Sequence, residues 1–484
     1  MRDFDIIRPF IYGDMMQQTI MENARQSQDV LYDAVNRMND LGAEFCDAKS
    51  QTIRSTGISS LNGELRQLVE KSTGGVCLRA WIGGRWGYGT VTSFDRKDIL
   101  KAAESAVRNA SGEKKSNLVL EPSAIRKKVD ADVRIHPDSV SLDEKISAAI
   151  DMDKAQSIDQ RIINSIGSYS EEIKDNCLVN SAGSDLSWQE VRTLCRAMSV
   201  AADGSRMERY YDGPDSTRGY EIVRDLDIEG VGRRTAEEAI ATLGAERAPS
   251  GNLTVISDPM VSGLLAHEAM GHASEGDEIT KKRSFLTDAV GKKMASDVIS
   301  MYDNGTVPGA HGSVPFDDEG TPSSCTKIID HGVYCGYMHS LETAAQLGVR
   351  PTGNGRAENF GKRTWVRMTN TYFGPGTWDK DELISDTKYG ILCDKMVNGM
   401  EDPVGGCFEA KCLRGYLVEN GEITKMLQSF TLTGKSVEIL CSADALSKEV
   451  VLDGGMCGKG IEDWVRVSSG GPYMRAKMIV GGGQ

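Results

Sequence analysis

Two histidines lie close together in a chain that has only six histidines among its 484 residues. They are His267 and His272, in the segment His-Glu-Ala-Met-Gly-His, where Glu268 directly follows the first histidine. Imidazoles hold a catalytic zinc in many hydrolases, and a carboxylate beside them takes the proton of the attacking water. The residue types in this segment therefore predict metal-assisted hydrolysis.

The spacing of the two histidines is unusual for a helical metal site. The common zinc helix places its histidines four residues apart, on one face. Five residues at about 100° each put His272 about 140° around an ideal α-helix from His267. A helix end or an i→i+5 bulge would remove the conflict, and Gly271 stands where such a distortion costs little strain. We therefore predict that the helix is not regularly α-helical at 270–272; two ordinary helix histidines are the alternative.

A catalytic zinc takes about three protein ligands and a water, so a third ligand must be found. Glu275 lies three residues beyond His272 and would share its face if the helix resumed, whereas Asp277 is a poorer option. The other possibility is a ligand from far along the chain, and Cys457 in the Gly-rich segment 453–460 is the candidate there. A thiolate at this position would be stabilised by zinc and by Lys459, although a buried structural thiol is the alternative.

The elements that precede this segment predict an α+β protein. Two successive units show the same order: a helix, several short strands and a second helix. In the first unit the expected elements are 29–39, 45–57, 64–72, 75–82, 85–93 and 95–109. In the second unit they are 142–156, 161–168, 175–181, 191–201, 206–212 and 234–243.

The rest of the chain predicts a large, mostly β domain that carries the histidine helix. A strand at 252–257 precedes a helix at 260–270, with Pro259 where a helix would begin. Beyond residue 280, short apolar runs alternate with Gly-rich turns, as is typical of strands. The expected divisions are an N-terminal extension (1–27), two helix and β-meander subdomains (28–115 and 135–248) and a mostly β catalytic domain (249–484).

Composition excludes several classes of protein. A net charge of −14 argues against binding of nucleic acid through the overall field of the protein. The sequence has no apolar run of about 18 residues, so no membrane-spanning helix is expected. The charged N-terminal residues are not expected to act as a signal peptide, and eleven cysteines without a paired framework fit a reducing compartment. We therefore expect a cytoplasmic protein.

A set of short motifs follows the histidine segment in a fixed order. The segments are 267–277, 316–322 (Phe-Asp-Asp-Glu-Gly-Thr-Pro), 352–356 (Thr-Gly-Asn-Gly-Arg), 367–372 (Arg-Met-Thr-Asn-Thr-Tyr), 455–459 (Gly-Met-Cys-Gly-Lys) and 480–482 (Val-Gly-Gly). In this combination the chain resembles the TldD/PmbA family, and within it the TldD-type subunit that bears the metal. The resemblance covers the chain from about residue 28 to the end.

The resemblance implies a zinc metallopeptidase that cleaves unfolded or extended peptides, including modified-peptide precursors and antitoxins. It also implies a dimer, either of two copies or with a TldE/PmbA-type subunit that lacks the zinc motif. Neither a membrane nor a nucleic acid is expected as a partner. The competing function is a non-catalytic, partner-binding regulator, as the older gyrase-modulator label of the family suggests.

The resemblance also assigns residues to roles. By position, it implies that His267, His272 and Cys457 are the metal ligands and that Glu268 is the general base. This choice prefers Cys457 to Glu275, which then orients a histidine from outside the ligand set.

Other polar residues of the shared motifs are less distinctive. Arg367 and Asn370 are candidates for supporting the site or for anchoring the substrate, since an arginine presents a fork of donors. Strand packing is the alternative for both. The acidic run 317–319 would suit a second cation or a substrate amino terminus, with a structural loop as the alternative.

Overall fold

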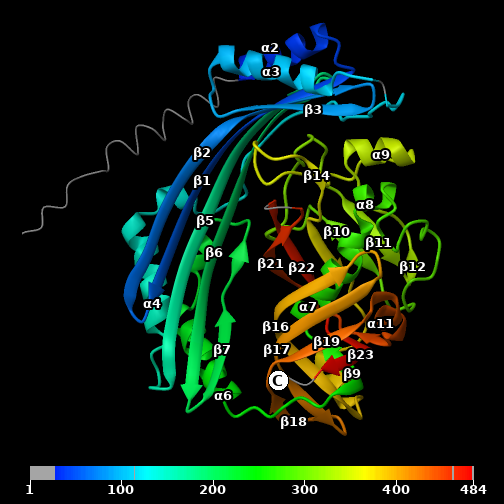
Figure 1. The fold of residues 1–484 in the computed structure, drawn as a ribbon. Coiled ribbons are helices and arrows are strands. Elements are labelled where there is room, and N and C mark those ends of the chain that lie inside the picture. The colour runs from blue at the N-terminus through cyan, green and yellow to red at the C-terminus, as the bar shows by residue number, and fades with distance from the viewer. Residues whose placement is uncertain (1–27, 114, 461–462, 482–484) are drawn as a thin grey trace, which may run out of the picture.

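The computed structural model describes residues 28–113, 115–460 and 463–481, so the expected extension at 1–27 lies outside the described residues. The chain has an α+β fold in which one long sheet runs beside a more irregular C-terminal part (Figure 1). No helix within the described ranges is long and apolar enough to cross a membrane.

The long sheet has eight strands. Its longest strands are β1 (Phe45–Leu61), β2 (Glu64–Ile82), β5 (Ile162–Asn180) and β6 (Asp185–Asp203). The shorter ones are β3 (Arg85–Val91), β4 (Arg126–Val129), β7 (Arg206–Asp212) and β8 (Asp215–Ser216). β1 and β5 pair antiparallel, from Asp47 opposite Asn180 to Leu61 opposite Ile166. The two predicted meanders are therefore joined edge to edge into one continuous sheet.

Helices pack on this sheet in two groups. Helices α2 (Gln28–Asp40) and α3 (Arg96–Ala110) pack on β1 to β3, where their apolar faces form one buried cluster. Helices α4 (Leu142–Lys154) and α6 (Ile228–Thr242) pack on β5 and β6, near the short helices η1 (Pro137–Ser139) and α5 (Glu221–Arg224). In Figure 1, α2 and α3 cover the upper end of the sheet and α4 lies farther along it.

The prediction of separate strands at 64–72 and 75–82 was wrong, because β2 continues through both. Gly74 and Gly75 had indicated a turn, but they lie within the strand. A Cβ added to Gly75 would lie 2.4 Å from a ring carbon of Phe360 and 2.3 Å from the carbonyl oxygen of Val91. Gly75 therefore permits a close approach of other parts of the chain, which is the other common role of a strand glycine.

The C-terminal part contains two larger sheets. The first has the order β12-β11-β10-β15-β22-β21. Its strands are β10 (Met301–Asn304), β11 (Cys325–Asp330), β12 (Val333–Tyr334), β15 (Asn370–Phe373), β21 (Val451–Gly458) and β22 (Trp464–Gly471). The second sheet consists of β9 (Gly251–Ser257), β16 (Tyr389–Asp402), β17 (Cys407–Glu419), β18 (Glu422–Leu427), β19 (Phe430–Lys435), β20 (Ala445–Leu446) and β23 (Met474–Gly481). Because β16 pairs with both β9 and β17, five strands of the second sheet close into a ring.

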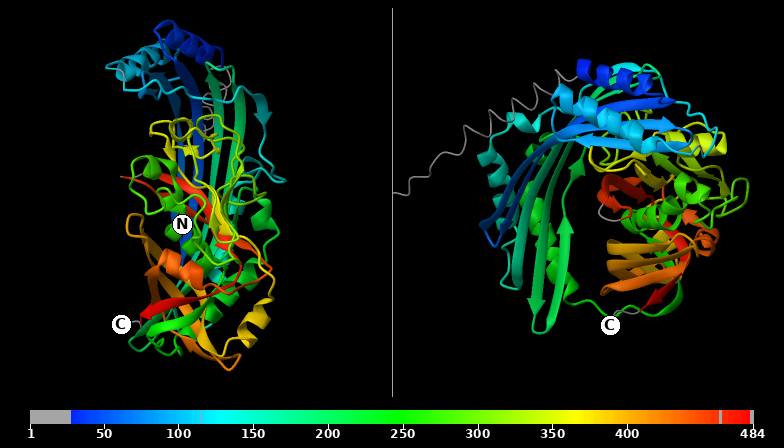
Figure 2. Two further views of the ribbon diagram at one scale, coloured as in Figure 1. Left: turned by 90° about the vertical axis from the view of Figure 1, so that its right-hand side faces the viewer. Right: turned by 45° about the horizontal axis from the view of Figure 1, so that its top comes forward.

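Short elements complete the C-terminal part. Strands β13 (Gly355–Arg356) and β14 (Trp365–Val366) form a two-stranded sheet. The helices are α7 (Pro259–Leu264), α8 (Gly276–Thr280), α9 (Leu341–Leu347), α10 (Lys380–Ser385) and α11 (Ser436–Ser442). Figure 2 shows the long sheet and the C-terminal part side by side, with α2 and α3 over the end where they meet.

Buried ion pairs join the long sheet to the C-terminal part. Arg79 of β2 contacts Asp47 in the sheet and Glu319 in the C-terminal part, the latter at 2.9 Å. Lys49 of β1 pairs with Asp318. The acidic run 317–319 therefore serves as a structural loop, in which Asp317 accepts hydrogen bonds from main-chain N–H groups.

The segment 259–273, which carries both histidines, lies in the largest buried cluster. Leu265, Ala266, Ala269 and Met270 are at most 2% exposed and pack with apolar residues from both C-terminal sheets. Burial of apolar surface is the main favourable term in folding, so the core fixes the position of this segment.

Candidate metal centre

The helix that leads to the histidines is fixed at its start. β9 ends at Ser257, and the side chain of Asp258 accepts a hydrogen bond from the N–H of Val261 at 2.9 Å, which is an N-cap. Pro259 follows in the first turn, where its missing N–H costs nothing. The second carboxyl oxygen of Asp258 accepts from the N–H of Lys395 at 2.9 Å, so the same side chain ties the helix to β16.

The helix changes form at the histidines. After α7 the chain continues as a π-helical turn, η2 (Leu265–Gly271), and then as a 3₁₀ turn, η3 (His272–Ser274). The N–H of His272 donates to the carbonyl oxygen of His267, which is an i→i+5 hydrogen bond. Residues five apart therefore lie above one another in this turn, and the two imidazoles come to the same side. The prediction that the helix is not regularly α-helical at 270–272 is confirmed.

Gly271 has a different role from the one expected. Its φ of −62° and ψ of −58° are ordinary for a right-handed helix, so the backbone does not use the freedom of glycine. A Cβ at this position would lie 2.2 Å from the sulfur of Met368. Glycine is required here because a buried side chain packs directly on the backbone of the turn.

The structure brings Cys457 to the two histidines. Cys457 lies on β21, and its Sγ is 3.3 Å from Nε2 of His272. One potential ligand atom from each of His267, His272 and Cys457 lies within 4.8 Å of the other two. The two imidazole rings are nearly perpendicular, at 86°, with centroids 5.0 Å apart. All three residues proposed as ligands thus converge, although they come from two distant segments.

The electrostatics of these residues suit a cation. Burial would raise the pKa of the Cys457 thiol, but His272 and His267 hold that pKa well below its usual range. Burial would likewise lower the pKa of His272, yet Cys457 and Glu275 raise it well above its usual value. A thiolate is therefore stable in this position only because positive charge lies next to it.

The donor set fits zinc. A thiolate and two imidazoles are the nitrogen and sulfur donors that Zn²⁺ prefers, and three protein ligands are the number found in catalytic sites. Nδ1 of His267 is buried and has no hydrogen-bond partner among the described residues. A buried nitrogen without a partner is costly, so a bound ion is a fitting partner for this atom.

Glu268 lies at the edge of this cluster. Its Oε2 is 3.9 Å from Nε2 of His272, and the side chain is partly exposed. Burial, with a hydrogen bond to Glu401, raises the pKa of Glu268 to about 7. A carboxyl group with this pKa can both take up and release a proton near neutral pH.

Glu275 supports His272 from behind. Its Oε2 lies 3.5 Å from Nδ1 of His272, on the opposite side of the ring from Cys457. Lys459 contacts the carboxylates of Glu275 and Asp277, at 2.7 Å each. We had expected Lys459 to stabilise the thiolate of Cys457. Instead, Lys459 anchors the carboxylate that orients a histidine.

Arg367 and Asn370 lie outside the cluster. Arg367 is fully buried and donates to the main-chain carbonyl oxygens of Cys457 and Asp463, so it holds the two ends of the β21–β22 connection together. Asn370 is also fully buried, and its amide bonds to Asn304, Ser313 and Gly312. These contacts favour packing and support of the site over substrate binding for both residues.

The sequence reasoning missed one residue beside the cluster, Glu401 of β16. Ligand atoms of Glu268, His272 and Glu401 lie within 4.8 Å of one another. The signal available in the sequence was the alternation along 397–401, which places Gly399 and Glu401 on the same face of a strand.

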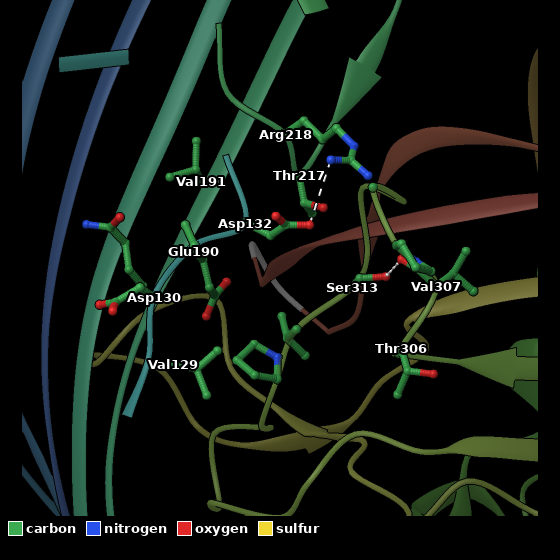
Figure 3. A pocket seen from close by; sticks show the side chains of 17 residues that line it. Val129, Asp130, Asp132, Glu190, Val191, Thr217, Arg218, Thr306, Val307 and Ser313 are labelled. Carbon is green, nitrogen blue, oxygen red and sulfur yellow. Dashed lines mark hydrogen bonds and ion pairs between the residues drawn. The ribbon is translucent and has the colours of Figure 1, made fainter. Parts of the chain in front are cut away.

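A pocket of about 270 Å³ lies elsewhere, between β6 and the loop that follows β10. Figure 3 shows its lining, with Glu190 on the sheet and Arg218 facing Asp132 at 3.7 Å. None of the three converging residues lines this pocket.

The converging side chains could hold a metal ion, and comparisons with known proteins identify the family. Three models of the PmbA/TldA metallopeptidase match the chain: domain 1 at 46–110, the central domain at 135–243 and the C-terminal domain at 250–483. A metalloprotease of Methanocaldococcus jannaschii is 31% identical over 91% of this chain and 97% of its own length. The chain therefore belongs to the PmbA/TldD family and is a metallopeptidase.

Other relatives support the same assignment. The Haemophilus influenzae metalloprotease TldD homolog is 28% identical, over 97% of this chain and 99% of that protein. The zinc metalloprotease TldD homolog of Saccharolobus solfataricus is 27% identical, over 94% and 100%. The solved structure of TldE from Thermococcus kodakarensis has the same fold, with a TM-score of 0.75 at 20% identity, over 94% of this chain and 99% of that one.

Proposed function

We propose that this metallopeptidase is a zinc enzyme that hydrolyses unfolded or extended peptides in the cytoplasm. The convergence of His267, His272 and Cys457 beside Glu268 carries the proposal. Zinc bound by these three side chains would acidify a water molecule and polarise a peptide carbonyl.

Other residues of the site would transfer the proton, orient His272 and position Cys457. Glu268 accepts the proton of the attacking water and later delivers it to the leaving amine. Glu275, anchored by Lys459, holds Nδ1–H of His272 and leaves Nε2 free to bind the metal. Arg367 fixes the main chain that presents Cys457.

Two features near the site suit an extended substrate. β21 is the outermost strand of its sheet, so within the described residues one of its edges pairs with no other strand. A peptide can add to such an edge through main-chain hydrogen bonds, which carry little sequence preference. Exposed apolar side chains also adjoin the site. Met456 on β21 is 51% exposed, and Met400 on β16 is 64% exposed.

Zinc content and peptide cleavage together test this function. The purified protein and the Glu268→Gln variant should each hold about one zinc, and only the first should cleave an unfolded peptide. Glu409→Gln is the matched control, because Glu409 is an exposed residue of β17 away from the cluster. Equal activity in Glu268→Gln would exclude this residue as the base. Absence of both zinc and cleavage would favour the non-catalytic regulator instead.

We also propose that the protein acts as a dimer, with a second copy or with a TldE/PmbA-type subunit. The first half of β2 is largely exposed, pairs with β1 but not with β3, and presents Leu65 and Leu68, at 42% and 41%, so this edge is available for a second subunit. Native mass spectrometry of the protein, alone and after coexpression with a related subunit, measures the stoichiometry. A monomer under both conditions would contradict the proposal.

A further inference from the structure

The edge of β6 has a gap between two of its partner strands. On the side away from β5, β4 pairs with residues 185–188 of β6, and β8 pairs with Thr193 and Leu194. Among the described residues, no strand pairs with 189–192 on that side. An unpaired stretch of strand edge can take up another extended segment through main-chain hydrogen bonds.

The main-chain groups of Val191 point into this gap. In an antiparallel strand, the N–H and C=O groups of alternate residues point to the same side. The N–H of Asp185 donates to Ile125 at 2.8 Å, on the side of β4. The N–H of Cys195 donates to Pro214 at 3.0 Å, on the side of β8. Val191 lies an even number of residues from both, so its N–H and C=O face the same side.

Val191 thus has a donor and an acceptor for which the chain offers no main-chain partner. No main-chain hydrogen bond joins Val191 to a residue outside β5 in the part of the chain that the structure describes. Val191 is buried, and buried N–H and C=O groups are nearly always paired with the chain, with water or with a ligand. The gap therefore suits a partner that has both a hydrogen-bond donor and an acceptor.

The pocket of about 270 Å³ opens on this gap. Three consecutive residues of β6, 189–191, line the pocket, so it lies at the edge of the strand and not over one face. The other walls are formed by 129–132 after β4, 217–218 after β8, and 305–309 and 313–315 of the loop that follows β10. Figure 3 shows Val191 on the sheet and Thr306 on the loop.

Hydrogen bonds hold this loop against the long sheet. The carbonyl oxygen of Gly309 accepts from the N–H of Thr217 at 3.1 Å and from Oγ of Ser216 at 2.6 Å. Arg192 of β6 donates to the carbonyl oxygen of His311 at 2.9 Å. The pocket is therefore formed by the protein alone, and a pre-organised site loses less affinity to ordering when a ligand binds.

We propose that this pocket binds an extended segment of a peptide substrate, which adds to β6 between β4 and β8. The main chain of such a segment offers both the donor and the acceptor that Val191 lacks. Its side chains would contact the apolar part of the lining, which includes Val129, Val307, Pro308 and Val314. This inference rests on the peptidase function proposed above and adds a second binding site for the same substrate.

The charges of the lining favour a basic segment. The lining contains three carboxylates, those of Asp130, Asp132 and Glu190, and one cationic side chain, that of Arg218. Glu190 is already paired with Arg192 at 2.8 Å, whereas Asp130 and Asp132 are largely exposed. Lysine or arginine in the peptide should therefore bind more tightly than glutamate, by at most about fivefold because exposed ion pairs contribute little.

Hydrogen exchange measured by mass spectrometry tests the proposal on zinc-loaded Glu268→Gln, which should bind a peptide without cleaving it. A saturating unfolded peptide that contains lysine and arginine should slow exchange in the fragment that contains 189–192. The same peptide with glutamate at those positions should bind more weakly in fluorescence anisotropy. Unchanged exchange in this fragment, or tighter binding of the acidic peptide, would overturn the proposal.

Two substitutions of one exposed residue, Thr306, assign the slowed exchange to the pocket. Both Thr306→Trp and Thr306→Val remove the hydroxyl that bonds Asn304 at 2.7 Å, but only tryptophan fills the pocket. The slowing should disappear in Thr306→Trp and persist in Thr306→Val; equal slowing in both would contradict the proposal. Faster exchange in Thr306→Trp before any peptide is added would identify a second copy or another part of this chain as the occupant, and would overturn it.

Cleavage by the zinc-loaded enzyme separates this inference from the proposed function. The substrates are a short peptide that occupies the zinc centre alone and a longer peptide that contains it. In Thr306→Trp, kcat/KM should fall about tenfold for the longer peptide only, as for the loss of about two main-chain hydrogen bonds. If the wild type cleaves neither peptide, the proposed function fails, while slowed exchange at 189–192 still supports the pocket. If both peptides are cleaved by Thr306→Trp as by the wild type, the inference fails alone.

Discussion

Replacing Lys459 by methionine tests whether the carboxylate behind His272 supports the site. Lys459 is 2.7 Å from Glu275 and from Asp277, and the Glu275 side chain is 1% exposed. Removal of one partner from a buried ion pair typically costs about 3–5 kcal/mol, since the other charge stays buried. The C-terminal domain spans 250–483, and a domain of this size loses roughly 2–4 °C of Tm per kcal/mol. The Tm of the Lys459→Met variant should therefore fall by about 10 °C. Zinc affinity should fall about 10–100-fold with the loss of support for the ligand.

The chain offers a matched control for this variant. Lys281 pairs with Asp277 at 3.8 Å, but its side chain is 42% exposed. An exposed pair contributes less than about 1 kcal/mol, so Lys281→Met should leave Tm and zinc affinity nearly unchanged. Differential scanning calorimetry and a competitive zinc chelator measure the two quantities. Equal effects of both substitutions would refute the reasoning, because burial would then not distinguish the two lysines.

Two further variants test the packing and the electrostatics around the site. Gly271→Ala should cost about 1–3 kcal/mol and weaken zinc binding, since the new methyl group would lie 2.2 Å from the sulfur of Met368. Gly57→Ala meets nothing within 4 Å and should cost less in a thermal melt; equal losses would exclude the packing explanation. Burial, with the nearby Asp215, raises the pKa of Asp453 to about 6, so the folded state binds the proton more tightly than the unfolded chain. Stability is therefore lost as pH rises from about 4 to about 6, and Asp453→Asn should stabilise the protein by about 2 kcal/mol at pH 7 but hardly at pH 4. The same gain at both pH values in chemical denaturation would contradict this cause.

Much of the fold could be predicted from the sequence, but strand lengths could not. Strands were expected at 161–168 and 175–181, whereas β5 runs unbroken from Ile162 to Asn180. The polar stretch between them contains Glu171, which is buried and pairs with Lys145 at 2.8 Å. A buried carboxylate breaks the apolar alternation that marks a strand, and its partner on another element cannot be found by reading the sequence locally.

Part of the candidate site could also be predicted from the sequence, and part of it could not. The five-residue histidine spacing and Gly271 predicted the distorted turn, because both concern one short segment. The Gly-rich segment 453–460 made Cys457 a candidate ligand, but only the family resemblance preferred it to Glu275, because no local pattern connects Cys457 to the histidines. Glu401 was missed, since the alternation along 397–401 indicates only its face of the strand, and its position depends on how β16 lies along the helix that carries Glu268.

The central claim is that His267, His272 and Cys457 bind zinc. Anomalous diffraction from crystals of the purified protein, measured just above and just below the zinc absorption edge, tests it most directly. We predict one difference peak, about 2.3 Å from Sγ of Cys457 and about 2.0–2.1 Å from a nitrogen of each histidine. A peak between Glu268 and Glu401 and away from Cys457, or no peak in crystals grown with zinc, would contradict the account.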